Sequence, residues 1–188
     1  PDVMYPQGFA TRIEAAGAAE GLETDFRPHF FGGVTTVVGK LLLQVGPDVA
    51  IFGEKDYQQL CVIRQLVRDL DIATTIVGAP TTREADGLAL SSRNAYLTPA
   101  ERAQAPALHK AISAVAAHVA KSGPGTIAVA TSDARAAIAA AGFAKIDYVE
   151  VRDAETLKAP EPGAKRPLRV LVAAWLGKTR LIDNIAVG

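Results

Sequence analysis

The apolar residues between Val34 and Val45 recur with the period of a helix. Spacings of three and four residues place on one side of that helix Val34, Val37, Val38, Leu41, Leu42 and Val45. The other side carries Thr35, Thr36, Lys40 and Gln44. The pattern predicts an amphipathic helix that ends at the Gly46-Pro47-Asp48 turn, whereas residues 1–33 predict loops with one short helical patch over 13–20.

A strand–helix–strand unit is predicted next. Residues 49–52 form a short apolar run between turn formers, which is typical of a parallel strand buried on both faces. A helical stripe then runs from Leu60 to Leu70, and residues 73–77 predict the second strand. Because open parallel sheets bind ligands at the carboxyl ends of their strands, a ligand is expected near residues 53–59.

Two helices are predicted beyond this unit, over 98–121 and 126–141. Thr98 is predicted as an N-cap, with Pro99 at the first helical position and Glu101 completing a capping box. Pro106 lies inside the first helix and predicts a kink or break near Gln104, because its ring removes one hydrogen bond and crowds the preceding turn.

The end of the chain predicts three strands without helices between them, over 146–152, 168–174 and 179–187. Such a succession favours an antiparallel sheet packed against the two helices. The segment 81–97 has no core periodicity of its own and predicts a long loop or hairpin, a kind of segment that often carries function. The sequence therefore predicts an α/β unit with a parallel sheet over 1–80 and a smaller α+β domain over 81–188.

The composition excludes several classes of protein. With 49% hydrophobic and 21% charged residues, the chain matches a globular protein rather than a disordered or fibrous one. Lys and Arg number 20, as do Asp and Glu, so the positive excess that nucleic-acid binding requires is absent. The single cysteine, Cys61, forms no internal disulfide and favours a reducing, cytoplasmic location. No apolar run approaches the roughly 20 residues of a membrane helix, so no membrane association is expected.

The turn after the first predicted strand, Gly53 to Gln59, is the first candidate site. Gly53 lets a ligand approach the backbone, Lys55 offers an ammonium group for phosphate oxygens, and Asp56 offers acceptors for ribose hydroxyls. The backbone N–H groups at the start of the next helix also attract an anion. A nucleotide fits this set, but a solvated turn with an ordinary Lys and Asp fits the spacing as well.

The second candidate site is the segment from Arg83 to Asn94, which contains two adjacent hydroxyls followed by a guanidinium, Ser91-Ser92-Arg93. These groups are donors without fixed negative charge, which suits a triphosphate during group transfer. A surface turn with Ser and Asn at turn positions remains the alternative.

Other reactive side chains form no recognisable site. His29, His109 and His118 share no metal-ligand spacing, and the last two are expected on a helix surface, so no metal site is predicted. Cys61 is expected to be a buried, inert thiol. No Gly-x-Ser-x-Gly motif is present, and neither Ser91 nor Ser92 has a histidine nearby in sequence, so a nucleophilic triad is unsupported.

Four motifs carry a resemblance to a known family: Gly33 to Val38, Pro47-Asp48 with Phe52 to Leu60, Asp86 to Asn94, and Leu181 to Asn184. In order and spacing they resemble the pantothenate synthetase (pantoate–β-alanine ligase) family over nearly the whole chain. Phe-Gly-Glu-Lys-Asp-Tyr-Gln-Gln and Leu-Ser-Ser-Arg-Asn are highly specific in combination, so the two surface-turn alternatives lose most of their weight.

The resemblance implies a Rossmann-like nucleotide-binding domain, of which residues 1–80 are the C-terminal part, related to the class I aminoacyl-tRNA synthetases. It also implies a homodimer. The implied activity is the ATP-dependent condensation of pantoate and β-alanine to pantothenate. Pantoate would react with Mg-ATP to give pantoyl adenylate and pyrophosphate, and the amine of β-alanine would then displace AMP.

By position, the resemblance implies these ATP-binding residues: Gly53, Glu54, Lys55, Asp56, Thr82, Leu90, Ser91, Ser92 and Arg93. The implied catalytic residues among them are Lys55, Ser91, Ser92 and Arg93. Lys55 would contact the phosphates, Asp56 the ribose, and the Thr82 backbone the adenine, while 90–93 would form a flexible phosphate-binding loop. Gln59 would hydrogen-bond pantoate, and Val37 and Val38 would line the apolar side of its pocket.

The chain departs from the family pattern in two places. The His-x-Gly-His signature of the family's first half is absent, and the segment from Arg27 to Gly32 has its histidine displaced by one residue and a glycine where a basic residue is usual. His29 and Gly32 are therefore not assigned to the site. Without leading strands, the sheet is expected to have an unpaired edge and an apolar face, so we expect the 188 residues alone to be poorly stable and catalytically incompetent.

Two other functional classes remain as alternatives. The chain could be a non-catalytic fragment or dimerisation module of such an enzyme, which would not bind ATP. A tRNA-binding relative of the synthetases is disfavoured by the zero net charge.

Overall fold

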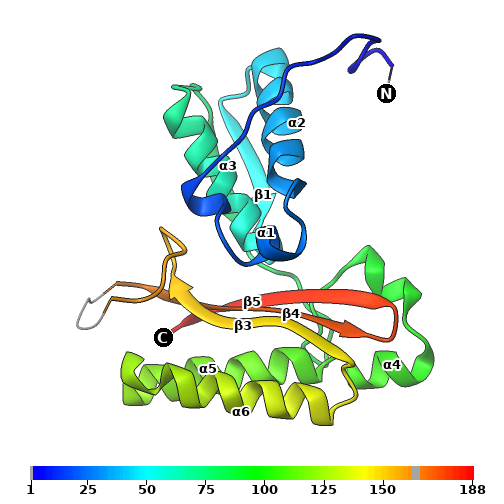
Figure 1. Cartoon of the computed structure of the whole chain (residues 1–188), viewed down its shortest axis with the longest axis vertical. Helices are drawn as coiled ribbons and strands as arrows, with labels where there is room; N and C mark the ends of the chain where they lie inside the picture. Colours follow the sequence, from blue (N-terminus) through cyan, green and yellow to red (C-terminus); the bar gives the residue numbers. More distant parts are fainter. Residues whose placement is uncertain (1, 162–165) are drawn as a thin grey trace. The chain divides into compact units, whose positions relative to one another are not determined.

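The computed structural model describes residues 2–161 and 166–188 (Figure 1). These form two compact units. The N-terminal unit consists of the residues up to 52 together with 58–77, and the C-terminal unit combines 53–57 with 78–188. The chain therefore leaves the N-terminal unit for five residues, Gly53 to Tyr57, before it returns.

The N-terminal unit contains the predicted strand–helix–strand arrangement. Its elements are the short 3-10 helix η1 (Gly17–Ala19), α1 (Glu23–Phe26), α2 (Phe30–Val45), β1 (Val49–Gly53), the 3-10 turn η2 (Glu54–Asp56), α3 (Tyr57–Asp69) and β2 (Thr75–Ala79). The turn η2 and the adjoining ends of β1, α3 and β2 belong to the C-terminal unit. Strands β1 and β2 pair in a parallel two-stranded sheet, which confirms the predicted class of sheet. The second strand begins two residues later than predicted, and the helical patch predicted over 13–20 is only the single turn η1.

The buried side of α2 differs from the predicted one. Val37 and Val45 are 41% and 70% exposed, whereas Thr35, assigned to the polar side, is fully buried. The Thr35 hydroxyl lies 2.8 Å from the backbone oxygen of Phe31 and 2.5 Å from that of Ile13, so its polar group is satisfied inside the protein. The helix buries its small side chains because the N-terminal segment packs closely there, and the apolar period alone could not reveal that contact.

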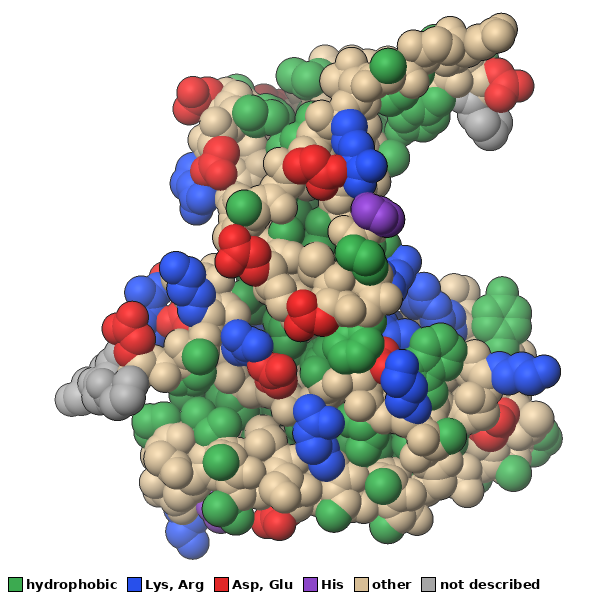
Figure 2. All heavy atoms as spheres, viewed as in Figure 1, with side chains coloured by type: hydrophobic (Ala, Val, Ile, Leu, Met, Phe, Trp, Pro, Cys, Tyr) green, Lys and Arg blue, Asp and Glu red, His purple; other side chains and the backbone are tan. Residues whose placement is uncertain are grey.

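Strand β1 is covered on one face only, so the prediction of two buried faces was wrong. Val49 and Ile51 are 52% and 69% exposed, while the alternating residues Ala50 and Phe52 are half-buried. A continuous apolar run permits burial on both faces but does not specify what covers each face. Apolar side chains therefore reach the surface of this unit (Figure 2). The larger ones are Val3, Phe9, Phe26, Val37, Leu41, Leu43, Val45, Val49, Ile51, Leu70 and Val77.

Two glutamines of α3 hold the irregular N-terminal segment. Gln58 accepts a hydrogen bond from the Glu23 backbone N–H (3.0 Å) and donates to the Ala18 carbonyl (3.1 Å). Gln65 accepts from the Ala18 N–H (3.0 Å) and donates to the Ala16 carbonyl (3.0 Å). The two glutamine side chains thus form hydrogen bonds with backbone N–H and C=O groups that have no partners from regular secondary structure.

The C-terminal unit has the predicted α+β architecture. Its elements are the 3-10 turn η3 (Ser92–Tyr96), α4 (Pro99–Gln104), α5 (Ala107–Ser122), the turn η4 (Pro124–Thr126), α6 (Ile127–Ala140), β3 (Lys145–Asp153), β4 (Leu168–Leu176) and β5 (Thr179–Val187). The strands form an antiparallel sheet in the order β3-β4-β5, and α5 and α6 lie side by side against one of its faces (Figure 1).

The predicted helix signals are confirmed. Thr98 accepts a hydrogen bond from the Glu101 N–H while the Glu101 side chain accepts one from the Thr98 N–H, which closes the capping box. The break near Gln104 separates α4 from α5, and Pro106 directly precedes α5.

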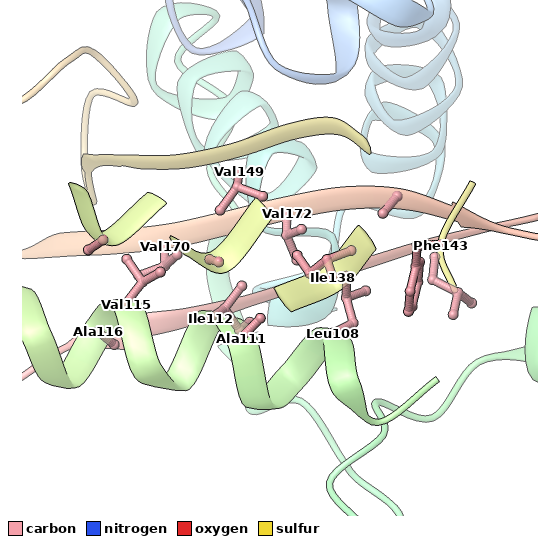
Figure 3. Close-up of a cluster of buried hydrophobic side chains, with 14 of the residues drawn as sticks. Leu108, Ala111, Ile112, Val115, Ala116, Ile138, Phe143, Val149, Val170 and Val172 are labelled. Atoms are coloured by element: carbon pink, nitrogen blue, oxygen red, sulfur yellow. The ribbon is translucent and has the colours of Figure 1, made fainter. Parts of the chain in front are cut away.

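The core of this unit lies between the sheet and its two helices (Figure 3). Ile112 of α5, Ile138 of α6 and Val172 of β4 are fully buried there. Helices α5 and α6 therefore cover one face of the sheet. The opposite face of β4 and β5 carries the polar side chains of Arg169 and Asn184, which form hydrogen bonds with Glu54.

Candidate functional site

A pocket at the edge of β5 brings the two predicted segments together. It lies wholly within the C-terminal unit and is lined by Lys55 of η2, by Ser91, Arg93 and Asn94 of the loop before α4, and by Arg180 and Asp183 of β5. We call it the β5-edge pocket. Because β5 is an edge strand of its sheet, its side is open to both the lysine turn and the serine-containing loop.

The loop that enters the pocket is fixed at its base by Arg83. Its guanidinium donates to both carboxylate oxygens of Asp183 on β5, at 2.7 and 2.9 Å, and to the Gly87 carbonyl at 3.1 Å. Asp183 is almost completely buried, so this bidentate pair lies in a poorly solvated place. The loop is thereby tied to the strand that forms the pocket wall.

A second cation ties the same loop to the following helix. Arg102 of α4 donates to Glu84 and to Asp86, both at 2.6 Å. The hydrogen bond from Arg102, followed by that from the Leu88 N–H, holds the pKa of Asp86 below its ordinary value. Both acidic side chains of the loop are thus engaged by Arg102.

The tip of the loop carries the donors. Ser91 caps η3 by accepting a hydrogen bond from the Arg93 N–H at 3.2 Å. The Asn94 amide donates to the Ala89 carbonyl at 3.1 Å, while its buried Oδ1 has no hydrogen-bond partner among residues 2–161 and 166–188. Ser92 and Arg93 are exposed. The tip therefore combines a fixed backbone with accessible polar groups.

Arg180 adds a third cation to Lys55 and Arg93 around the pocket. Its Nε donates to Asp147 at 2.7 Å, and Asp147 is 1% exposed. Burial raises the pKa of Asp147, but hydrogen bonds from Arg180, Lys145 and Trp175 outweigh it and hold that pKa below its ordinary value. Three cationic side chains therefore line one small pocket, beside the carboxylate of Asp183.

Lys55 of the first candidate site and Ser91 and Arg93 of the second line the same pocket, as expected if both sites bind one triphosphate. Other predicted residues make backbone or structural contacts. Leu90 donates its N–H to the Thr82 carbonyl at 2.9 Å, and the Glu54 carboxylate accepts from Arg169 at 3.0 Å. Gly53 and Asp56 flank Lys55 in the same turn.

The predicted pantoate-binding residues Gln59, Val37 and Val38 belong to the N-terminal unit, and their role stays a prediction. Val37 lines an open groove within that unit, together with Arg12 and His29.

Arg180 and Asp183 were not assigned to the site from the sequence, and Asn94 was given no role within the second candidate segment. Asn94 and Asp183 lie inside two of the four family motifs, which was a usable signal. Arg180 has a weaker signal, namely a charged residue at the beginning of an otherwise largely apolar strand.

His109 is not the surface residue that the sequence suggested. Its Nδ1 lies 3.4 Å from an oxygen of Asp183, and its side chain is 21% exposed, whereas His118 of the same helix is exposed as expected. Burial lowers the pKa of His109, the Arg83 cation lowers it further, and Asp183 acts in the opposite direction.

His109 should make stability depend on pH in mildly acidic solution. Because the folded protein holds this pKa below the ordinary value of 6.5, the unfolded chain takes up the proton first, and the free energy of unfolding should fall as the pH drops below that value. Above it, His109 is neutral in both states and adds nothing. Urea denaturation of the His109→Gln variant between about pH 5 and 7.5 should show a flatter profile than the wild type.

The matched control for this prediction is His118→Gln, because His118 lies exposed on the same helix. It should keep the wild-type profile. An unchanged slope in the His109 variant would contradict the assignment.

Residues 2–161 and 166–188 contain no group of three or more His, Cys, Asp or Glu side chains placed to hold a metal ion. Within the same ranges, no helix has both the length and the apolar character needed to cross a membrane.

Comparison with known proteins identifies the family. The fold is a parallel α/β unit joined to an α+β unit whose edge strand bears a cationic pocket, and residues 1–186 match the family model for pantoate-beta-alanine ligase. The chain belongs to this family. It is 58% identical over 187 residues to pantothenate synthetase of Caulobacter vibrioides and 60% identical over 189 residues to that of Mesorhizobium japonicum.

These alignments cover 98% of the chain but 65% and 64% of the two relatives, so the chain spans about two thirds of their length. Among solved structures, pantothenate synthetase of Thermus thermophilus superposes with a TM-score of 0.89 at 46% identity, covering 99% of this chain and 67% of that one. The pantoate-beta-alanine ligase of Francisella tularensis, complexed with beta-gamma ATP and beta-alanine, gives 0.75 at 33% identity, covering 98% of this chain and 61% of that one.

Proposed function

We propose that the protein condenses pantoate and β-alanine to pantothenate, using ATP and releasing AMP and pyrophosphate through a pantoyl adenylate. The observation that carries the proposal is the convergence of Lys55, Ser91 and Arg93 on one pocket within one unit. Family membership supports it, as do the relatives named pantothenate synthetase. Those relatives do not favour the alternative of a non-catalytic module.

The chemistry assigned to the pocket is charge stabilisation. Lys55 and Arg93, with the Ser91 and Ser92 hydroxyls, hold the triphosphate while the pantoate carboxylate attacks the α-phosphorus and pyrophosphate leaves. Asp56 binds the ribose, the Thr82 backbone binds the adenine, and Gly53, Glu54 and Leu90 complete the ATP site. Such a reaction needs aligned reactants and fixed positive charge rather than a covalent intermediate on the protein.

The second half of the proposed reaction uses the acyl adenylate as its substrate. The amine of β-alanine attacks the acyl carbon, and AMP leaves. Gln59 donates to or accepts from pantoate, and Val37 and Val38 contact its apolar part. Magnesium enters with ATP as part of the substrate, since Mg²⁺ is commonly held by substrate phosphates with few protein ligands.

We further propose that the protein acts as a homodimer in the cytoplasm and binds neither nucleic acid nor membranes. The buried thiol of Cys61 and the zero net charge support the location and the absence of a nucleic-acid partner. Sedimentation of the purified protein tests the dimer directly.

The proposed reaction is tested with protein expressed from its complete gene. Pantoate, β-alanine and Mg-ATP should give pantothenate and AMP in equal amounts. Omission of pantoate or of β-alanine should stop the formation of pantothenate. Pantoate labelled with ¹⁸O in its carboxylate should transfer one label to AMP, because the adenylate passes a carboxylate oxygen to the phosphate. Formation of ADP and phosphate, or AMP without label, would contradict the mechanism.

A further inference from the structure

One amide side chain holds the backbone of the lysine turn. The Nδ2 of Asn184 on β5 donates hydrogen bonds to the carbonyl oxygens of Glu54 (2.9 Å) and Lys55 (2.8 Å). Asn184 is 3% exposed, while Glu54 and Lys55 are half-buried. The two carbonyls belong to a five-residue excursion whose flanking residues are in the other unit. The turn is thus anchored to β5.

The orientation of this amide is fixed by Arg169 on β4. The Arg169 Nε donates to the Asn184 Oδ1 at 2.6 Å, which leaves the NH₂ group to face the turn. The same guanidinium donates to the Glu54 carboxylate at 3.0 Å and lies 3.7 Å from the centre of the Tyr57 ring. Three residues of the turn therefore contact Asn184 or Arg169.

Asparagine suits this position for a chemical reason. The site needs two N–H donors toward the turn and one acceptor toward Arg169, and a primary amide supplies both within one short side chain. Aspartate would present oxygens to two carbonyl oxygens, and an aliphatic residue would leave both carbonyls without these partners. Neither preserves the arrangement.

We propose that Asn184 is a positioning residue that sets the place of Lys55 in the β5-edge pocket. Asn184 does not line the pocket, whereas Arg180 and Asp183 of the same strand do. One strand then fixes both a wall of the pocket and the turn that carries Lys55. The inference rests on the proposed function, because it assigns Lys55 to the phosphates of ATP.

Asn184→Ala is expected to weaken ATP binding about tenfold, measured by titration calorimetry with Mg-ATP. Adenosine binding should weaken less than ATP binding, because adenosine keeps only the ribose contact assigned to Asp56 and has no phosphates for Lys55 to contact. A merely structural role would weaken both ligands alike. In the Lys55→Ala background the Asn184→Ala change should add less than twofold, since a residue that acts through Lys55 has nothing left to position.

The matched control is Thr131→Ala, which also removes side-chain hydrogen bonds to two backbone carbonyls, those of Ile127 and Ala128 on helix α6. It should leave ATP binding unchanged. Asn184→Asp should resemble or exceed Asn184→Ala, because its carboxylate faces the two carbonyl oxygens.

Hydrogen exchange keeps this proposal separate from the proposed function, because it needs no ligand. Amides of residues 53–57 should exchange faster in Asn184→Ala, while those of 168–176 keep their protection. Wild-type protein without ATP binding or turnover would overturn the proposed function, and the exchange result would still test the anchor. Unchanged exchange at 53–57, or effects of Asn184→Ala and Lys55→Ala that multiply fully, would overturn the positioning role.

Discussion

Replacing Lys55 by alanine should lower kcat/KM for pantothenate formation by about 30- to 1,000-fold, which corresponds to about 2–4 kcal/mol of transition-state stabilisation. The reason is that Lys55 lines the pocket assigned to the triphosphate, where negative charge shifts as pyrophosphate leaves. The loss should appear in adenylate formation, so the measurement is the rate of pyrophosphate release at saturating pantoate.

Lys178→Ala is the control for this experiment. Lys178 is exposed in the turn between β4 and β5 and takes no part in the pocket. Its removal deletes the same charge from the same unit and should leave the rate within about twofold, as expected for a surface substitution. Near-normal adenylate formation by Lys55→Ala would contradict the assignment of Lys55 to the phosphates.

Asp183→Ala should lower the free energy of unfolding by about 3 kcal/mol, the lower end of the range for breaking a buried ion pair. The Asp183 side chain is 4% exposed and receives both arms of Arg83, which is itself 21% exposed. Its removal leaves a half-buried guanidinium without its main partner and frees the Asn184 N–H that Asp183 also accepts. Urea denaturation at neutral pH measures the loss.

Asp133→Ala provides the comparison, because Asp133 is exposed on α6 and should change stability by less than about 0.5 kcal/mol. The double variant Arg83→Met, Asp183→Ala should cost clearly less than the two single changes together, since neither partner is then left behind. Strictly additive losses would show that the two side chains do not depend on each other.

Local signals predicted the C-terminal unit well. The capping box at Thr98, the break at Pro106 and the three strands follow from residues that act on their immediate neighbours. The N-terminal unit was predicted less well, because the buried side of α2 depends on a segment more than 20 residues away. Thr35 is buried through its contact with the Ile13 carbonyl, and no property of the helix itself signals that partner.

The candidate site shows the same division. Lys55, Ser91 and Arg93 could be named because their segments are distinctive motifs, and the structure places them around one pocket. Arg180 and Asn184 could not be assigned roles, since their significance depends on contacts across more than 30 and more than 120 residues of chain. A polar residue in a strand shows that it needs a partner, but the sequence does not name the partner.

The chain passes between the two units three times, at 52–53, 57–58 and 77–78. No single linker therefore separates them, and cleavage at the last junction alone would leave residues 53–57 covalently joined to the N-terminal unit. A recombinant C-terminal unit that starts at Gly78 would lack the pentapeptide containing Lys55. To retain Lys55 together with Arg93 and Arg180, such a protein would need residues 53–57 joined to it through an engineered linker.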